Sequence, residues 1–302
     1  MNIEDKNTIL SSHKKSITVL SLFDGISCGK LALERAGIKV DRYYASEIDR
    51  FALQISNKNY PDIIQLGDVT KWREWDIDWS KIDLLIGGSP CQGFSIAGKQ
   101  LNFRDERSKL FFEYVDILNH IKSFNPDVKF LLENVCMKKE YQNIISSYLG
   151  TSPIKINSAL LSAANRNRLY WTNFNFDVPA DKGITFDNIN DHSEDWLSND
   201  YIDKVSKWKA QQDPIKNTTF IGHNSKLPCL TARGYNQSHS GMILISDGTR
   251  YRYLSNAEAE LAMTLPIGYT DGISNRERAR CLGNGWTVDV IAHIFTYLKE
   301  LL

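Results

Sequence analysis

The amino-acid sequence predicts an α/β fold in which a doubly wound, mostly parallel sheet is accompanied by a small irregular domain. Short β-branched and apolar runs alternate with helix-forming segments from Ile17 to Trp171, and this repetition favours a parallel sheet covered on both faces. The alternation stops after about Thr172 in a polar stretch that is too long for a loop. We therefore predict a main domain at 1–172 that 250–302 completes, and a second domain at 173–249.

The first elements follow from local residue types. Ile17–Leu22 is β-branched and apolar, which is typical of a buried strand. Lys30–Ala36 carries helix-forming residues and ends at a glycine. Tyr43–Ser46 predicts the second strand, and Arg50–Asn59 predicts a helix that ends before Pro61.

The later elements continue the alternation. Short buried strands are expected at Ile63–Leu66, Leu84–Ile86 and Phe130–Leu132, with a helix at Leu110–Ser123 between the last two. Regularity returns at Asn256–Leu265, and apolar residues at helical spacing predict a closing helix at Thr287–Leu302. Ligands of such sheets bind at the carboxyl ends of the strands, which is where the polar motifs of this chain fall.

Composition narrows the class of protein. The 302 residues are 42% hydrophobic and 24% charged, as in ordinary globular proteins. No apolar run approaches the roughly 18 residues of a membrane span, and the first residues carry no signal-peptide core. Five cysteines form no C-x-x-C pair, which favours a reducing, cytoplasmic setting over a disulfide frame or a metal site. The net charge is zero, so DNA binding would depend on local basic patches.

Three consecutive strand ends predict a nucleoside site. The turn Asp24–Gly29 follows the first strand, Glu47 ends the second, and Asp68 ends the third. An α/β fold places a carboxylate such as Glu47 against ribose hydroxyls, while Asp68 is expected to accept from an adenine amino group and Phe23 to cover the ring. The alternatives are a solvated loop acid for Glu47 and a core side chain for Phe23. Without a pyrophosphate-binding motif, S-adenosylmethionine fits this pattern better than a dinucleotide.

A nucleophile and an acid follow the next two strands. Residues 87–92 read Gly-Gly-Ser-Pro-Cys-Gln and residues 133–135 read Glu-Asn-Val. A thiolate of Cys91 that adds to C6 of cytosine, with Glu133 donating at N3, makes C5 reactive toward a sulfonium methyl group. Asn134 is expected to hold the loop. The alternative is a buried structural thiol beside an unrelated acid.

Asn-Arg-Asn-Arg at 165–168 precedes a predicted strand at Leu169–Trp171. If the strand alternates, Arg166 and Arg168 face the same side and grip the cytosine O2, the Glu133 carboxylate and a phosphate. An exposed basic strand end is the alternative.

In this order, these motifs resemble those of the cytosine-5 DNA methyltransferases over nearly the whole chain. Arg252-Tyr253-Leu254 with Glu258, Leu265-Pro266, and Gly-Asn-Gly-Trp-Thr-Val at 283–288 continue the likeness. The motif sequences are most similar to those of the animal de novo branch, and Ala164 stands where many bacterial members have Gln. A compact bacterial or phage enzyme is nevertheless expected, because the sequence shows no N-terminal reader domain like those of the animal enzymes.

The resemblance implies a Rossmann-like, S-adenosylmethionine-dependent methyltransferase sheet with a target-recognition domain. Cys91 would be the nucleophile, Glu133 the partner of N3 and Arg168 the contact to O2, supported by Arg166. The positions that match the family's cofactor motifs would line the cofactor pocket, and they are Phe23, Asp24, Gly25, Ile26, Cys28, Glu47, Ile48, Asp68, Val69, Gly88, Leu110, Asn284 and Trp286.

Double-stranded DNA is the expected partner, with a cognate restriction enzyme as a further candidate. Because a base inside a duplex is out of reach, the cytosine must be flipped out. Residues 93–109 resemble the family's catalytic loop, or form a basic surface loop, and Arg233 is expected to read a guanine edge. The predicted DNA contacts are Gln92, Ser95, Lys99, Arg104, Arg107, Arg233, Tyr235 and Gln237.

Two rival functions stay open. One branch of the family methylates transfer RNA, although Gly-Ser-Pro-Cys here replaces its usual Pro-Pro-Cys. A non-catalytic regulatory homologue is the second rival, and such proteins usually lose the cysteine or the acid, both of which this chain has.

Overall fold

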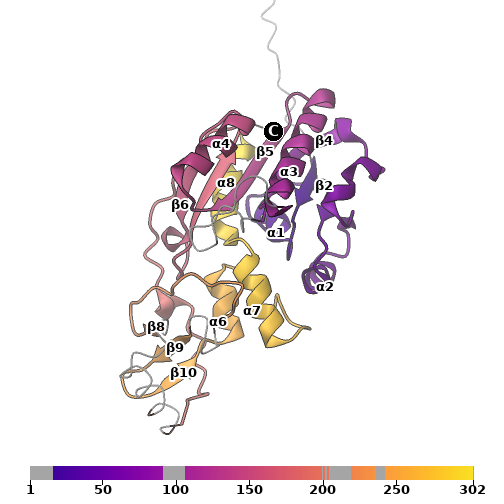
Figure 1. The fold of residues 1–302 in the computed structure, drawn as a ribbon. Coiled ribbons are helices and arrows are strands. Elements are labelled where there is room, and N and C mark those ends of the chain that lie inside the picture. The colour runs from indigo at the N-terminus through magenta and orange to yellow at the C-terminus, as the bar shows by residue number, and fades with distance from the viewer. Residues whose placement is uncertain are drawn as a thin grey trace, which may run out of the picture.

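The computed structural model describes residues 16–90, 106–198, 200, 203, 219–235 and 242–301, except for the side chains of residues 106–108. Its main feature is a seven-stranded sheet of order β3-β2-β1-β4-β5-β7-β6 (Figure 1). The strands are β1 (Ile17–Leu22), β2 (Val40–Ser46), β3 (Ile64–Gln65), β4 (Ile82–Gly87), β5 (Lys129–Val135), β6 (Ile154–Asn157) and β7 (Asn167–Thr172).

The sheet is mostly parallel, as predicted. Strands β1 to β5 pair in parallel, whereas β7 pairs antiparallel with both β5 and β6. The carboxyl ends of the five parallel strands therefore meet at one edge. At that edge the antiparallel β7 begins, so its first residues lie beside the last residues of β5.

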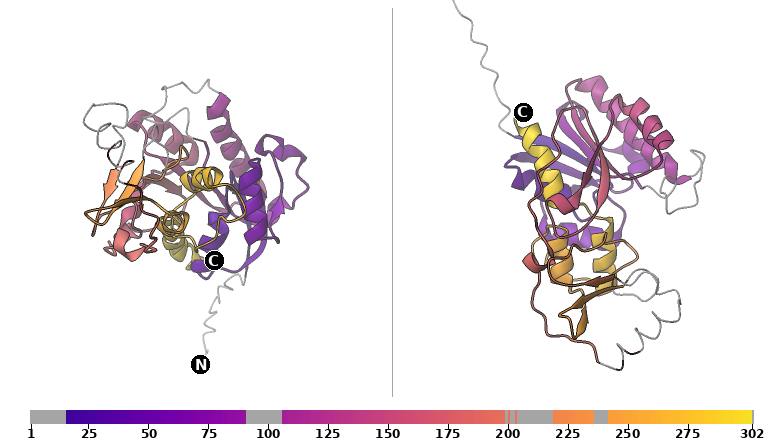
Figure 2. Two further views of the ribbon diagram at one scale, coloured as in Figure 1. Left: turned by 90° about the horizontal axis from the view of Figure 1, so that it is seen from below. Right: turned by 90° about the vertical axis from the view of Figure 1, so that its left-hand side faces the viewer.

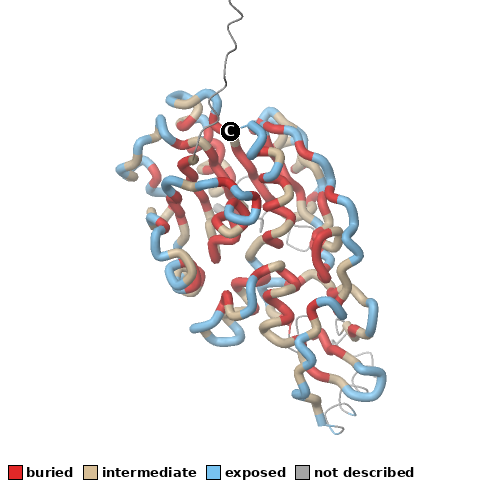
Figure 3. The backbone as a smooth tube through the Cα atoms, turned by 180° about the vertical axis from the view of Figure 1, so that it is seen from behind, coloured by how far each residue is buried: buried red, intermediate tan, exposed pale blue. Residues whose placement is uncertain are grey.

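Helices cover both faces of the sheet (Figure 2). Alternate residues of one strand serve the two faces, since Val19 packs in the core that includes α1 and α8, while Leu20 packs in the core of α3 and α4. The sheet strands and the inner sides of these helices form the buried interior (Figure 3). The α-helices are α1 (Cys28–Arg35), α2 (Arg50–Asn59), α3 (Glu106–Phe124), α4 (Lys139–Leu149), α6 (Asn256–Ala262), α7 (Asn275–Asn284) and α8 (Val288–Lys299). The short 3₁₀ helices are η1 (Val69–Glu74), η2 (Trp79–Lys81), η3 (Ser158–Leu160) and η4 (Phe186–Asn188).

Helix ends follow local chemistry. Helix α2 has its predicted bounds because Asp49 caps its first N–H groups, accepting from Phe51 and Ala52. Helix α6 stops before the predicted Leu265, since Thr264 takes a left-handed backbone conformation with φ of 56°. No helix in the described part of the chain is long and apolar enough to cross a membrane.

A second, three-stranded sheet lies at the opposite end of the molecule from α4 (Figure 1). It consists of β8 (Thr219–Ile221), β9 (Ile243–Ser246) and β10 (Tyr251–Tyr253). Strand β8 is parallel to β9, and β10 is antiparallel to it. This sheet extends past residue 249, so its last strand belongs to the segment that we predicted to complete the main domain. The domain bounds themselves remain a prediction.

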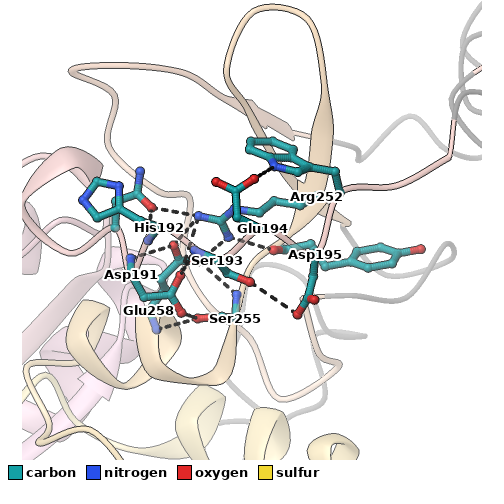
Figure 4. Close-up of polar contacts among 11 residues, drawn as sticks. Asp191, His192, Ser193, Glu194, Asp195, Arg252, Ser255 and Glu258 are labelled. Carbon is teal, nitrogen blue, oxygen red and sulfur yellow. Dashed lines mark hydrogen bonds and ion pairs between the residues drawn. The ribbon is translucent and has the colours of Figure 1, made fainter.

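A buried ion pair ties β10 to α6 (Figure 4). Arg252 binds Glu258 through two hydrogen bonds of 2.9 and 2.6 Å and also donates to Asn190. Glu258 is fully buried and accepts in addition from the backbone N–H of Ser255. Because buried charges are stable only when they are paired, this ion pair fixes the start of α6 against the strand and the segment at residue 190.

We expect Arg252→Ala to lower the free energy of unfolding by about 3–5 kcal/mol, because it leaves the Glu258 charge buried and unpaired. The control Arg250→Ala removes a half-exposed guanidinium that pairs with Asp247, and it should cost less than about 1 kcal/mol. Urea unfolding of both variants measures the difference, and equal losses would contradict the assignment.

Candidate active site

The loop after β1 is strained. Phe23 and Ser27 have φ values of 57° and 61°, and Gly25 lies between them at 60°. Left-handed backbone is costly for a bulky residue such as phenylalanine and is concentrated at functional sites. The Asp24 carboxylate holds this loop by accepting hydrogen bonds from the hydroxyls of Ser21, Ser27 and Tyr43. Burial raises the pKa of the Asp24 carboxyl above its ordinary value.

Glu47 is fixed by backbone donors. Its Oε2 accepts from the N–H of Gly25 at 2.8 Å, and its Oε1 accepts from the N–H groups of Ile48 and Asp49, each at 2.8 Å. The carboxylate thus joins the end of β2 to the strained loop after β1. Each oxygen keeps acceptor capacity for a hydroxyl donor.

The surroundings of Glu47 suit an adenosine group. Ile48 is 73% exposed, which is unusual for a large apolar side chain in a polar neighbourhood. A Cβ atom added to Gly25 or Gly67 would meet nothing within 4 Å, so space is open beside both loops. Asp68 caps η1 with its Oδ1, which accepts from the N–H and the hydroxyl of Thr70, and its second carboxylate oxygen keeps acceptor capacity for a ligand.

Several predicted cofactor residues have buried side chains. Those of Ile26, Cys28 and Val69 pack in the apolar cores. The Asp24 carboxylate accepts from hydroxyls of β1, the loop and β2, namely those of Ser21, Ser27 and Tyr43. Of the remaining predictions, Phe23 and Leu110 are half-buried and Asn284 is exposed.

The Glu133 carboxylate is the centre of the second half of the site. It is 8% exposed, at the end of β5. Its Oε1 pairs with Nε of Arg168 at 2.9 Å, and its Oε2 accepts from the indole N–H of Trp286 at 3.0 Å. In the register of β5 and β7, Arg168 lies opposite Val135, two residues beyond Glu133. The predicted contact of Arg168 with Glu133 is confirmed.

The loop that leads to Cys91 is anchored from β5. The side-chain amide of Asn134 donates to the carbonyl and the hydroxyl oxygen of the buried Ser89, at 3.3 and 3.2 Å. This is the predicted role of Asn134. Cys91 itself lies outside the described residues, one position beyond Pro90.

Arg166 corrects the prediction that both arginines face the acid or the substrate. Arg166 immediately precedes β7, which begins at Asn167. The Arg166 guanidinium is buried and donates to the carbonyls of Leu230, Gly283 and Gly285, at 2.9, 3.0 and 2.8 Å. Burial, with the nearby charge of Arg168, lowers the pKa of the Arg166 guanidinium. Arg166 therefore binds the chain itself and is not placed for a phosphate grip of the kind predicted.

The predicted DNA contacts are only partly described. Arg233 is exposed on the turn after Leu230. Tyr235 is a correction, since it is 2% exposed in the core and its hydroxyl donates to Asn256. The predicted residues Gln92, Ser95, Lys99, Arg104 and Gln237 and the side chain of Arg107 lie outside the described residues.

Sequence reasoning missed two features of the site. Trp286 is predicted at the cofactor, and no sequence signal indicates its hydrogen bond to an acid 153 residues earlier. The second is a close backbone contact at Gly283, where a Cβ atom would lie 2.1 Å from the backbone of Thr231. Only glycine permits this approach, which the Gly-Asn-Gly motif at the end of α7 could have suggested. Among the described residues, no group of three or more His, Cys, Asp and Glu side chains could hold a metal ion.

Comparison with known proteins gives curated relatives among bacterial and phage methyltransferases. Type II methyltransferase M1.ScrFI of Lactococcus lactis subsp. cremoris is 29% identical over 94% of this chain and 78% of its own length. Type II methyltransferase M.HpaII of Haemophilus parainfluenzae is 30% identical over 68% of this chain and 62% of its own length. Orphan methyltransferase M.Rho11sI of Bacillus phage rho11s is 35% identical over 51% and 32%. The chain thus spans less than two thirds of the length of M.HpaII and of M.Rho11sI. The likeness to the animal de novo branch stays a prediction.

Solved structures share the fold. The Entamoeba histolytica methyltransferase EhMeth superposes with a TM-score of 0.73 at 17% identity, covering 95% of this chain and 99% of that one. A putative DNA modification methyltransferase encoded within an Escherichia coli prophage superposes with a TM-score of 0.65 at 21% identity, covering 95% and 99%. At these identities the likeness concerns the fold alone.

The family match covers the loops described above. Residues 17–144, from β1 to within α4, match the C-5 cytosine-specific DNA methylase family. This range includes the strained loop, Glu47, Asp68, the Gly87–Pro90 segment and Glu133. The chain therefore carries a C-5 cytosine-specific DNA methylase domain at residues 17–144, and its curated relatives are methyltransferases.

Proposed function

We propose that this chain methylates carbon 5 of cytosine in double-stranded DNA, with S-adenosylmethionine as the methyl donor. The observation that carries the proposal is the Glu133 carboxylate, buried at a strand end and held on both oxygens by Arg168 and Trp286. It lies beside the segment Gly88–Pro90 that leads into Cys91. An acid and a thiol at adjacent strand ends are the groups that activation of cytosine requires.

The first step is covalent addition to a flipped-out cytosine. The Cys91 thiolate forms a bond to C6, the electrons of the C5–C6 double bond shift toward C4, and those of the C4–N3 double bond shift onto N3. Glu133 takes up a proton before this step, gives it to N3 and returns to the carboxylate form. Arg168 and Trp286 are placed to stabilise that charge on its two oxygens.

The second stage regenerates the enzyme. Addition at C6 makes C5 electron-rich, and S-adenosylmethionine, when bound, supplies an electrophilic methyl group there. Water then takes the C5 proton, which restores the C5–C6 double bond and expels the Cys91 thiolate, and the N3 proton returns to Glu133. The cysteine thus divides one difficult substitution into two easier steps.

The cofactor is proposed to lie along the ends of β1, β2 and β3. Glu47 would accept from the ribose hydroxyls, Asp68 from the adenine amino group, and the exposed Ile48 would cover the ring. The strained loop at Phe23–Ser27 would approach the cofactor with its backbone. DNA recognition by the part of the chain around Arg233, and a cognate restriction enzyme as biological partner, are proposed on the resemblance.

We expect purified protein to transfer a tritiated methyl group from S-adenosylmethionine to duplex DNA. Cys91→Ser should abolish incorporation, and Glu133→Gln should lower the rate about 10²- to 10⁴-fold, because the acid no longer gives a proton to N3. The control Glu113→Gln changes a different glutamate that accepts from an indole, that of Trp72, and should retain activity. Incorporation into transfer RNA alone would favour the rival function, and no incorporation into either would favour the regulatory one.

Duplex DNA that carries 5-fluorocytosine should trap the protein as a covalent adduct, since fluorine cannot leave C5 as a proton does. Peptide mapping is expected to find Cys91 modified. Burial raises the pKa of the Cys28 and Cys281 thiols to about 12, so both remain protonated near pH 8 and should be unmodified. An adduct at either of these thiols, or one that persists in Cys91→Ser, would be inconsistent with the mechanism.

Glu47→Gln should raise the dissociation constant for S-adenosylmethionine about tenfold or more, because a charged acceptor of the ribose hydroxyls is lost. Glu34→Gln, which changes an exposed carboxylate of α1 that accepts from Tyr60, is the control. Isothermal titration calorimetry measures both variants. An unchanged constant for Glu47→Gln would remove this residue from the cofactor site.

A further inference from the structure

Trp286 contacts the acid of the site instead of only lining the cofactor pocket. We infer that Trp286 is a positioning residue whose indole N–H orients the Glu133 carboxyl and stabilises the charge left on it when its proton moves to N3 of cytosine. This inference rests on the proposed function and adds a residue from the C-terminal segment to the activation step.

The absence of a side chain at Gly88 makes room for the indole. Its Nε1 lies 3.0 Å from Oε2 of Glu133. A Cβ atom on Gly88 would lie 3.0 Å from both of these atoms, so any side chain there would press on the hydrogen bond itself. At the other end, the ring lies beside Gly29, where an added Cβ atom would be at an ordinary contact distance of 3.5 Å from Cζ3 of Trp286. The ring is therefore seated between the start of α1 and the end of β4.

The backbone on either side of Trp286 is also fixed. The carbonyl of Gly285 accepts from Arg166 at 2.8 Å, and the N–H of Val288 donates to the carbonyl of Met263 at 3.1 Å. Because both flanks are held, the indole N–H has a defined direction before any substrate binds. Such preorganised donors stabilise developing charge without reorganisation at the moment of reaction.

Each oxygen of the Glu133 carboxylate accepts from a different side chain. Arg168 contacts Oε1 from β7, and Trp286 contacts Oε2 from the segment after α7. Held on both sides, the carboxyl plane cannot turn freely, so its proton is directed consistently toward the base. Hydrogen bonds to a charged acceptor are stronger than those between neutral groups. Loss of the Trp286 hydrogen bond should therefore destabilise the state in which Glu133 has given up its proton and carries a charge.

Exchange of the cytosine C5 hydrogen with water tests this role without methyl transfer. Addition of Cys91 to C6 and protonation at N3 give an electron-rich C5 that takes a proton from water, and reversal of these steps releases the original tritium. With duplex DNA tritiated at C5 and saturating S-adenosylhomocysteine, Trp286→Phe should lower the exchange rate about 10- to 100-fold. Saturation removes any effect of a changed cofactor affinity.

Trp72→Phe is the matched control, since it deletes another indole hydrogen bond to a glutamate, Glu113, outside the site. It should exchange at the wild-type rate. Gly88→Ala attacks the Trp286–Glu133 hydrogen bond without altering either residue, and it should also slow exchange, so the test does not depend on one variant folding. Circular dichroism and thermal melting establish that each variant is folded.

A double-mutant cycle separates positioning from a general structural effect. In a Glu133→Gln background there is no acidic proton to orient, so adding Trp286→Phe should change exchange by less than about twofold. Equal additional losses in both backgrounds would overturn the inference. So would a wild-type exchange rate in folded Trp286→Phe, even with weaker cofactor binding, because Trp286 would then serve the cofactor alone. Absence of exchange in the wild-type protein would instead count against the proposed function.

Discussion

The burial of one carboxylate governs the arrangement of this site. Glu133 lies at a strand end with little access to water, and a charge removed from solvent is tolerated only with close partners. Its partners come from β7 and from the segment between α7 and α8. Two segments that follow Glu133 at a distance in the sequence must therefore lie at the same edge of the sheet to pair this group. The antiparallel β7 and the C-terminal segment both meet that requirement.

A second buried charge extends this arrangement toward the recognition part of the chain. Arg166 joins the carbonyl of Leu230 to those of Gly283 and Gly285. Leu230 precedes the turn that carries Arg233, and Gly285 precedes Trp286. The segment that is proposed to read DNA and the segment that holds the acid thus share one guanidinium. Backbone strain at Phe23 and Ser27 is maintained at the cofactor side of the same edge, where the hydroxyls around Asp24 hold it.

Local patterns predicted the part of the fold that depends on local chemistry. The buried run of β1 and the capped helix α2 have the predicted bounds, because apolar periodicity and the Asp49 cap act over a few residues. The placement of β7 between β5 and β6 was not predicted, since strand order depends on pairing between distant segments. The helix α4 and the strand β6 were also missed.

The same distinction holds within the site. Motif order predicted Glu133, Arg168 and Asn134, and the contact of Arg168 with Glu133 and the anchoring of the Ser89 loop by Asn134 follow those predictions. Arg166 was assigned to the substrate because strand alternation was expected to place it on the same face as Arg168, and Tyr235 was assigned to DNA because it lies in the predicted target-recognition domain. Their partners, at Gly285 and Asn256, are far away in sequence and come close only in the folded chain.

Cys91 and Glu133 are proposed to act on cytosine in DNA. Bisulfite sequencing of plasmid DNA from cells that express the chain tests this proposal directly. It reports the modified base and its sequence context together. We expect cytosines that resist conversion in one recurring sequence context, and none in plasmid from cells that express Cys91→Ser. Complete conversion in both samples, with the folded protein present in the cells, would refute the proposal.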